Sequence, residues 1–151
     1  MNFIKIFLVF TSITILTACS SLLLEPAHFG WPLESVLKVD KDGVVKEDRY
    51  AINFNTQTLF FEETQDSLSF DGKSIRLIRN DEGYYFMTSI DFKNVYVFSV
   101  DKNAFSLKNK ILINEIGMLN PAFNQRSPFI ELLADGKAYK LISEGIVEGV
   151  K

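Results

Sequence analysis

Cysteine and histidine are almost absent from this chain of 151 residues, which contains one of each, Cys19 and His28. An internal disulfide needs two cysteines, so the chain has to fold by packing alone. Zinc sites use clustered histidines and cysteines, and nucleophilic triads place a base such as histidine beside the nucleophile. The chain also lacks the Gly-x-Ser-x-Gly segment typical of many hydrolases. We therefore predict no cofactor, no metal site and none of the common catalytic triads.

Positive charge is also scarce. Lys and Arg together number 16 against 19 Asp and Glu, which gives a formal net charge of −3. Nucleic-acid binding depends on a concentrated basic surface, so the composition predicts no nucleic-acid partner. An acidic domain is also not attracted to an anionic membrane surface. Aromatic side chains, by contrast, are abundant, with 14 Phe, 5 Tyr and 1 Trp, and they favour strands and large buried contacts.

Residues 1–18 have the three parts of a secretory signal peptide. Lys5 gives a weakly basic start, an apolar run from Ile6 to Leu16 follows, and small residues end the segment. The run is too short, and too interrupted by hydroxyl groups, for a permanent membrane-spanning helix. We expect a signal-peptide helix over 1–18, a tether over 19–30 that contains His28, and a single domain over 31–151.

The segment Leu16-Thr17-Ala18-Cys19 resembles the lipobox of bacterial lipoproteins, in which Leu, a small or β-branched residue, Ala or Gly, and Cys follow in order. The resemblance implies cleavage before Cys19 and transfer of a diacylglycerol to its sulfur. Two acyl chains on one residue are enough for stable membrane anchoring. Two alternatives stay open, an ordinary signal peptide that ends near a cysteine and an uncleaved anchor.

The residue after the cysteine bears on location. In bacteria that sort lipoproteins between two membranes, an aspartate at this position tends to retain the protein on the inner membrane. Ser20 stands there in this chain. The resemblance therefore implies the bacterial cell envelope, and it favours the outer membrane.

From Trp31 onward, short alternating apolar runs are separated by turn dipeptides, and helical periodicity hardly appears. We expect an all-β domain, either an antiparallel β-sandwich or a partly closed β-barrel, of about nine or ten short strands. Asp-Gly dipeptides at 71–72 and 135–136 predict tight hairpins. The expected strand runs include 35–39, 44–54, 59–61, 68–70, 74–79, 84–89, 94–100, 105–107, 110–113, 129–133, 138–142 and 146–147.

The longest irregular segment is 114–127, which shows no sustained period. Long loops on rigid sheets often carry binding residues, and aromatic and arginine side chains are enriched at binding hot spots. The competing interpretation is a plug, in which Leu119 and Phe123 close one end of the core. The candidate partner-binding residues are Met118, Leu119, Phe123, Asn124, Gln125 and Arg126.

A second candidate site is the aromatic set Tyr84, Tyr85, Tyr96 and Phe98. Exposed aromatic rings of this kind bind sugars, whereas buried ones belong to the core. We weigh the core interpretation above the sugar site for this set.

Two functions follow from these observations. The first is a non-catalytic binding or assembly module, held at the membrane by lipid on Cys19, with an envelope protein or a glycan as its partner. The second is a small envelope hydrolase, for example of a glycosidase type, that uses carboxylates from the acidic turns at 62–66 and 81–82. Two carboxylates facing each other across a cleft favour the hydrolase, and a closed barrel with an apolar surface patch favours the module.

Overall fold

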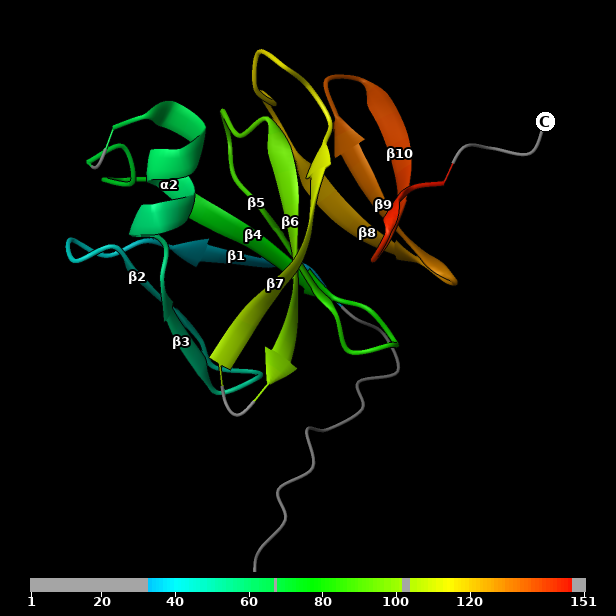
Figure 1. Cartoon of the computed structure of the whole chain (residues 1–151), viewed down its shortest axis with the longest axis horizontal. Coiled ribbons are helices and arrows are strands. Elements are labelled where there is room, and N and C mark those ends of the chain that lie inside the picture. Colours follow the sequence, from blue (N-terminus) through cyan, green and yellow to red (C-terminus); the bar gives the residue numbers. More distant parts are fainter. Residues whose placement is uncertain (1–32, 67, 102–103, 148–151) are drawn as a thin grey trace, which may run out of the picture.

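A computed structural model of the chain describes residues 33–66, 68–101 and 104–147 (Figure 1). This part of the chain is an all-β domain of antiparallel sheets with one helix, and none of its sheets closes into a barrel. The predicted all-β class is confirmed, in its sandwich form. The signal peptide, the lipobox with Cys19, and the 19–30 tether with His28 lie outside the described residues.

The central sheet has five antiparallel strands in the order β1-β4-β5-β6-β7. Strands β4 to β7 follow one another as a meander, and β1 pairs with the outer edge of β4. All four residues of β5 and the first four of β6 are buried, which is typical of central strands that are covered on both faces. The bounds are Ser35–Lys38 for β1, Ser74–Arg79 for β4, Tyr85–Thr88 for β5, Asn94–Asp101 for β6 and Ala104–Leu112 for β7.

A second sheet has four strands in the order β11-β10-β9-β8. Its β9–β10 hairpin turns at Asp135-Gly136, where φ is 52° and 77°, so the hairpin predicted from this dipeptide is confirmed. Strand β8 approaches β4, and β11 approaches β7, so this sheet covers one face of the central sheet. The bounds are Ala122–Arg126 for β8, Phe129–Ala134 for β9, Lys137–Ile142 for β10 and Gly145–Ile146 for β11.

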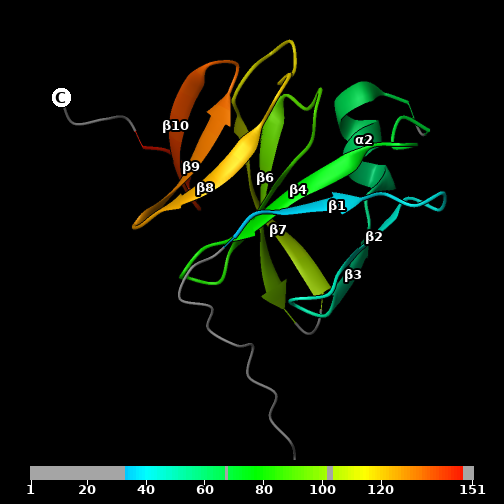
Figure 2. The same cartoon turned by 180° about the vertical axis from the view of Figure 1, so that it is seen from behind.

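The other face of the central sheet is covered by a two-stranded hairpin and by the helix. The hairpin is formed by β2 (Val44–Glu47) and β3 (Ile52–Asn55), and α2 (Gln57–Thr64) follows it directly. Figures 1 and 2 show α2 and this hairpin on one side of the central strands, with β8, β9 and β10 on the opposite side.

Two rows of side chains point to opposite faces of the central sheet, because neighbouring residues of a strand alternate. Leu77, Met87 and Tyr96 are paired in register. They lie on the sheet face that α2 covers, because the Tyr96 hydroxyl donates a hydrogen bond to Glu63 of α2. Ile78, Phe86 and Val97 form the other row, toward the second sheet. All of these apolar side chains are buried, and they join one continuous core.

The helix is the largest difference from the sequence prediction, which placed a strand at 59–61. The side-chain oxygen of Asn55 accepts the Gln57 N–H at 2.8 Å, and the Thr56 N–H donates to the Gly43 carbonyl, so the chain turns into a helix there. The helix buries Phe60 and Glu63, which lie three residues apart on one face. The aromatic run favours a strand only locally, and these tertiary contacts override it.

Two further strand predictions are wrong. The run 44–54 is not one strand, because a turn at 48–51, with Ala51 at φ 52°, folds it back on itself as β2 and β3. Residues 68–70 are not a strand, and Asp71-Gly72 does not close a hairpin, because β4 pairs with β1 and β5 instead. The turn that replaces this strand is held by the Asp66 carboxylate, which accepts the Leu68 N–H at 2.9 Å.

The predicted 114–127 loop is correct only in its first half. Residues 122–126 form β8, an edge strand paired with β9, and therefore belong to the second sheet. The remaining segment is fastened to the loop after β5, because the Met118 N–H donates to the Phe92 carbonyl at 2.9 Å and the Asp91 N–H donates to the Met118 carbonyl at 2.8 Å. The sequence did not reveal β8 because its pattern is short and polar.

Candidate ligand-binding groove

An open groove with a volume of about 1250 Å³ lies between the hairpin, the helix and the central sheet. One wall consists of residues 50–55 of the hairpin and the exposed start of α2. The opposite wall consists of the β4–β5 turn, β5, and the paired ends of β6 and β7. Each wall thus belongs to a hydrogen-bonded element, so the shape of the groove is fixed by secondary structure.

The floor of the groove is a set of aromatic rings in edge-to-face contact. Tyr50 meets Tyr85 with ring centroids 5.5 Å apart and planes at 89°, and Tyr85 meets Phe105 at 5.1 Å. Phe54 lies 5.2 Å from Phe105, again at 89°, and Phe98 lies 5.6 Å from Phe105. Such contacts contribute about 0.5–1.5 kcal/mol per pair beyond the buried area. They attach the hairpin to the sheet and leave a groove lined by ring edges.

Arg79, the last residue of β4, is the cation at this floor. Its guanidinium carbon lies 5.7 Å from the centroid of the Tyr85 ring, within cation–π range. Its Nε–H is buried and meets no hydrogen-bond acceptor in the described part of the chain. No carboxylate within residues 33–66, 68–101 or 104–147 forms an ion pair with it either. A buried donor without an acceptor costs about 1–3 kcal/mol, so this arginine is unusual in its setting.

The surroundings raise the pKa values of two tyrosines of the floor. Burial raises the pKa of Tyr50, and the nearby guanidinium of Arg49 partly offsets that rise. Burial likewise raises the pKa of Tyr85, and the positive charge of Arg79 partly offsets that rise. Both hydroxyls therefore stay protonated at neutral pH and present no negative charge to Arg79.

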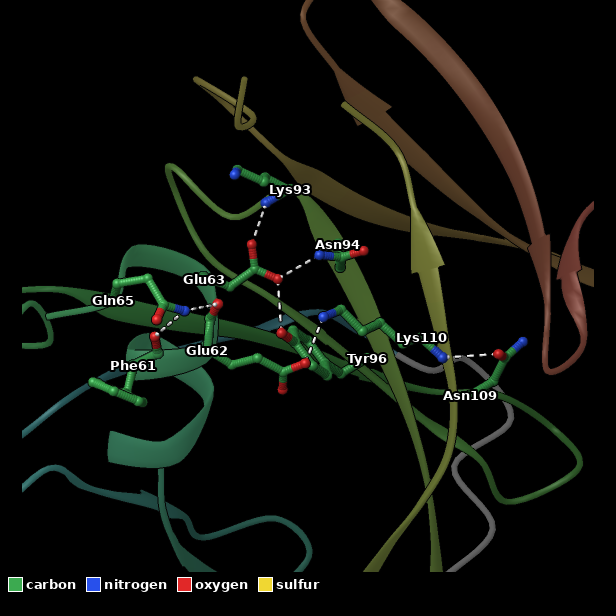
Figure 3. A network of polar contacts seen from close by, with 9 residues as sticks. All are labelled: Phe61, Glu62, Glu63, Gln65, Lys93, Asn94, Tyr96, Asn109 and Lys110. Carbon is green, nitrogen blue, oxygen red and sulfur yellow. Dashed lines mark hydrogen bonds and ion pairs between the residues drawn. The ribbon is translucent and has the colours of Figure 1, made fainter. Parts of the chain in front are cut away.

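Two carboxylates line the groove, Glu62 from α2 and Glu82 from the β4–β5 turn. Glu62 forms an ion pair with Lys110, whose ammonium nitrogen also lies 5.6 Å from the centroid of the Tyr96 ring (Figure 3). An oxygen of Glu82 lies 3.5 Å from the side-chain amide nitrogen of Asn80, which is long for a hydrogen bond. A glycosidase needs one carboxyl as a proton donor and one as a nucleophile or base. The Lys110 contact already occupies an oxygen of Glu62.

A buried carboxylate, Glu63, fastens the helix behind the groove (Figure 3). It accepts hydrogen bonds from the Lys93 N–H at 2.6 Å, from the Asn94 side-chain amide at 2.7 Å and from the Tyr96 hydroxyl at 2.7 Å. Burial, followed by the hydrogen bond to Glu63, raises the pKa of Tyr96 well above its ordinary value. Neither Glu63 nor Tyr96 lines the groove, so this network positions the wall and takes no direct part in binding.

The residues predicted in the 114–127 segment do not form one surface. Met118 and Phe123 are buried in the core, with exposed fractions of 0% and 6%. Leu119, Asn124 and Arg126 are exposed, and Gln125 is half-buried. The plug interpretation is therefore correct for Phe123 and wrong for Leu119, which is 66% exposed.

The side chains of Asn124 and Arg126 both contact Glu131, at 3.5 and 3.4 Å. Partner binding by this segment stays a prediction.

The predicted aromatic set is also divided. Tyr84, Tyr85 and Phe98 line the groove, whereas Tyr96 is buried behind it. The sequence analysis missed Tyr50, Phe54, Phe105 and Arg79 as groove residues. The sequence places Tyr50 and Phe54 in the single strand expected over 44–54, where their alternation favours burial on one face. Only the chain reversal at 48–51 brings these rings opposite β5 and β7.

Residues 33–66, 68–101 and 104–147 contain no group of three or more His, Cys, Asp or Glu able to hold a metal ion. Within these same ranges no helix combines the length and the apolar character needed to cross a membrane. Comparison with family models, with curated proteins and with solved structures found no match to this chain.

Proposed function

We propose that this chain is a lipid-anchored, non-catalytic binding module of the bacterial cell envelope, and that the aromatic groove is its ligand site. The observation that carries the proposal is the groove itself, a large concave space lined by aromatic rings with one convergent cation, Arg79. Binding sites are typically concave, mostly apolar and supplied with a few polar groups that orient the ligand.

The anchor in this proposal is Cys19 of the lipobox, which would carry the diacylglycerol, with Ser20 favouring the outer membrane. The partner is an envelope component, a protein or a glycan, or a smaller molecule of the envelope. Replacing the acylated sulfur removes the anchor, so Cys19→Ser should abolish labelling by radioactive palmitate and move the protein out of the membrane fraction. Palmitate incorporation into the Cys19→Ser protein would rule out this anchor.

The binding part is tested by photo-crosslinking in intact envelopes. A benzoylphenylalanine replaces Leu107, which lines the groove and is 53% exposed, or Val36, which lies outside the groove and is 57% exposed. The two positions match in exposure and differ only in location. We expect a discrete crosslinked product from position 107 and none from position 36. Equal products from both, or product from position 36 alone, would contradict the groove as the ligand site.

The second candidate is the envelope hydrolase, which Glu62 and Glu82 favour because both line the groove. In that case Glu62→Gln and Glu82→Gln should each abolish hydrolysis of envelope glycan while leaving the denaturation midpoint nearly unchanged. The binding-module proposal predicts no hydrolysis by the unaltered protein.

A further inference from the structure

We infer that the groove takes a linear apolar chain that ends in a single anionic group, a carboxylate or a phosphate, and that Arg79 contacts this end. The inference rests on the proposed function, since it names the ligand chemistry of the same groove. It depends on three observations, which are the unpaired Arg79 donor, the arrangement of the rings, and the place where the chain leaves the domain.

Arg79 provides the charge argument. Among the described residues its buried Nε–H has no acceptor, and no carboxylate of these residues forms an ion pair with it. Of the two carboxylates that line the groove, Glu62 forms an ion pair with Lys110, and Glu82 has only the 3.5 Å contact with the Asn80 amide. Guanidinium groups pair best with carboxylate and phosphate oxygens, which accept from two N–H groups at once. An anionic group of a ligand in the groove would pair with the Arg79 guanidinium, which no carboxylate of the described residues neutralises.

The ring arrangement favours an apolar chain over a sugar. The pairs Tyr50–Tyr85 and Phe54–Phe105 both meet at 89°, so in each pair the edge of one ring covers part of the face of the other. A sugar stacks on an open, flat ring face and also needs many hydrogen-bonding groups for its hydroxyls. The groove offers ring edges together with the aliphatic side chains of Ile52, Leu59, Met87 and Leu107. A flexible alkyl chain packs against such a surface through non-directional contacts.

The position of Leu33, the first described residue, brings the groove near the membrane, which is a source of anionic alkyl chains. Arg49 donates to the carbonyl of Leu33 at 3.2 Å and to the hydroxyl of Ser35, and the next residue, Tyr50, lines the groove. The segment from Cys19 to Leu33 spans at most about 50 Å even when fully extended. With Cys19 in the bilayer, Leu33 therefore lies within about 50 Å of the membrane, where fatty acids and lipid head groups are concentrated, and the groove begins at Tyr50, one residue after the Arg49 that contacts Leu33.

The test measures binding of four soluble probes that share one alkyl chain, octanoate, octyl phosphate, octanol and octylamine. The lipidated protein is held in phosphatidylcholine nanodiscs, and equilibrium dialysis is corrected with protein-free nanodiscs. We expect octanoate or octyl phosphate to bind at least about tenfold more tightly than octanol, and octylamine to bind most weakly. Preference for octanoate points to a free fatty acid as the natural source, and preference for octyl phosphate to a lipid head group.

The arginine variants identify the contact. Arg79→Gln should remove the preference for the anionic probes, and Arg79→Lys, which keeps the charge and lacks the Nε–H, should keep part of it. Arg126→Gln on β8 is the control and should bind like the unaltered protein, because its side chain is 60% exposed and does not line the groove. Denaturation midpoints confirm that each variant is folded, and Arg79→Lys carries the test if Arg79→Gln does not fold.

Three results would overturn the inference. Equal binding of octanoate, octyl phosphate and octanol would show an apolar groove without anion recognition, which contradicts the inference and leaves the proposed function standing. An anion preference that persists in Arg79→Gln would place the anion elsewhere. Binding of none of the four probes would contradict the ligand chemistry, and the crosslinking at position 107 would then decide the proposed function separately.

Discussion

The buried carboxylate of Glu63 accepts a hydrogen bond of 2.7 Å from the hydroxyl of Tyr96, and this contact joins α2 to the centre of the five-stranded sheet. The same carboxylate also accepts from the Lys93 N–H and from the Asn94 amide. Because α2 contributes Thr58, Leu59 and Glu62 to one wall of the groove, the network behind the groove determines where that wall stands.

Replacing Glu63 by Gln should therefore destabilise the domain. The glutamine amide presents two N–H groups and one oxygen to three donors, so at least one buried donor loses its acceptor. We expect a loss of about 1–3 kcal/mol in the free energy of unfolding, measured by urea denaturation. Glu62→Gln is the matched control on the same helix and should cost less than about 1 kcal/mol, because its ion pair with Lys110 is solvent-exposed. Equal losses in the two variants would show that the buried network has no special role.

Alkaline pH should weaken the fold through the buried tyrosines. Burial and the bond to Glu63 raise the pKa of Tyr96 in the folded state, whereas the unfolded state keeps the ordinary value of 10.0. Above about pH 10 the unfolded chain loses a proton that the folded protein retains, so the free energy of unfolding falls as pH rises. Below about pH 9 this tyrosine contributes no pH dependence.

The measurement is the free energy of unfolding at several pH values between about 8 and about 11, for the unaltered protein and for Tyr96→Phe. The variant should lose up to about 1.4 kcal/mol less per pH unit above pH 10, since it lacks one titrating group. Parallel curves for the two proteins would mean that Tyr96 ionises equally easily in both states.

Phe123 and Arg126 lie on the same edge strand and should respond very differently to truncation. Phe123 is 6% exposed, so Phe123→Ala should cost about 3–5 kcal/mol of stability. The Arg126 side chain is 60% exposed, and Arg126→Ala should change stability by no more than about 0.5 kcal/mol. Denaturant melts compare the two. A small loss from Phe123→Ala would return this residue to the list of surface binding candidates.

Gly117 should tolerate no side chain. Its φ is +94°, and an added Cβ would lie 2.6 Å from the carbonyl oxygen of Asp91, in a segment fastened to the 89–92 loop by backbone hydrogen bonds. Gly136 is the control, because it also has a positive φ, +77°, but has no atom within 4 Å of the added Cβ. We expect Gly136→Ala to cost about 1–2 kcal/mol from the left-handed conformation alone, and Gly117→Ala to cost clearly more in the same thermal or urea melts. Similar costs would show that the 114–118 segment moves freely away from Asp91.

The all-β class, the strands near 74–79, 84–89 and 94–100, and the Asp135-Gly136 hairpin could be predicted from the sequence, because each depends on local apolar patterns and turn chemistry. The helix at Gln57–Thr64 could not, since it begins where the Asn55 side chain and the Gly43 carbonyl, twelve residues apart, meet the chain. Strand β1 pairs with β4, far along the chain, and no local pattern encodes that choice. The Asp71-Gly72 prediction is wrong for the same reason, because β1 already occupies that edge of β4.

The groove could be predicted only in part. The aromatic set predicted from the sequence includes three groove residues, Tyr84, Tyr85 and Phe98. Their partners Tyr50, Phe54 and Phe105 come from elements that no local pattern places beside them. Arg79 ends the strand expected over 74–79, and no sequence pattern marks it as a groove residue. Its missing acceptor is a property of the three-dimensional surroundings, which the order of residues does not reveal.

The central claim is that the aromatic groove, and no other surface, binds the ligand, and methyl NMR of the lipidated protein in nanodiscs tests it most directly. Octanoate and octanol are titrated in turn while the methyl signals of Met, Ile and Leu residues are followed. We expect shifts at Met87 and Ile52, which line the groove, and none at Ile130 and Leu132, which are buried residues of β9 in the second sheet. Shifts at Ile116 and Leu119 of the exposed 114–121 segment, with Met87 and Ile52 unchanged, would contradict it.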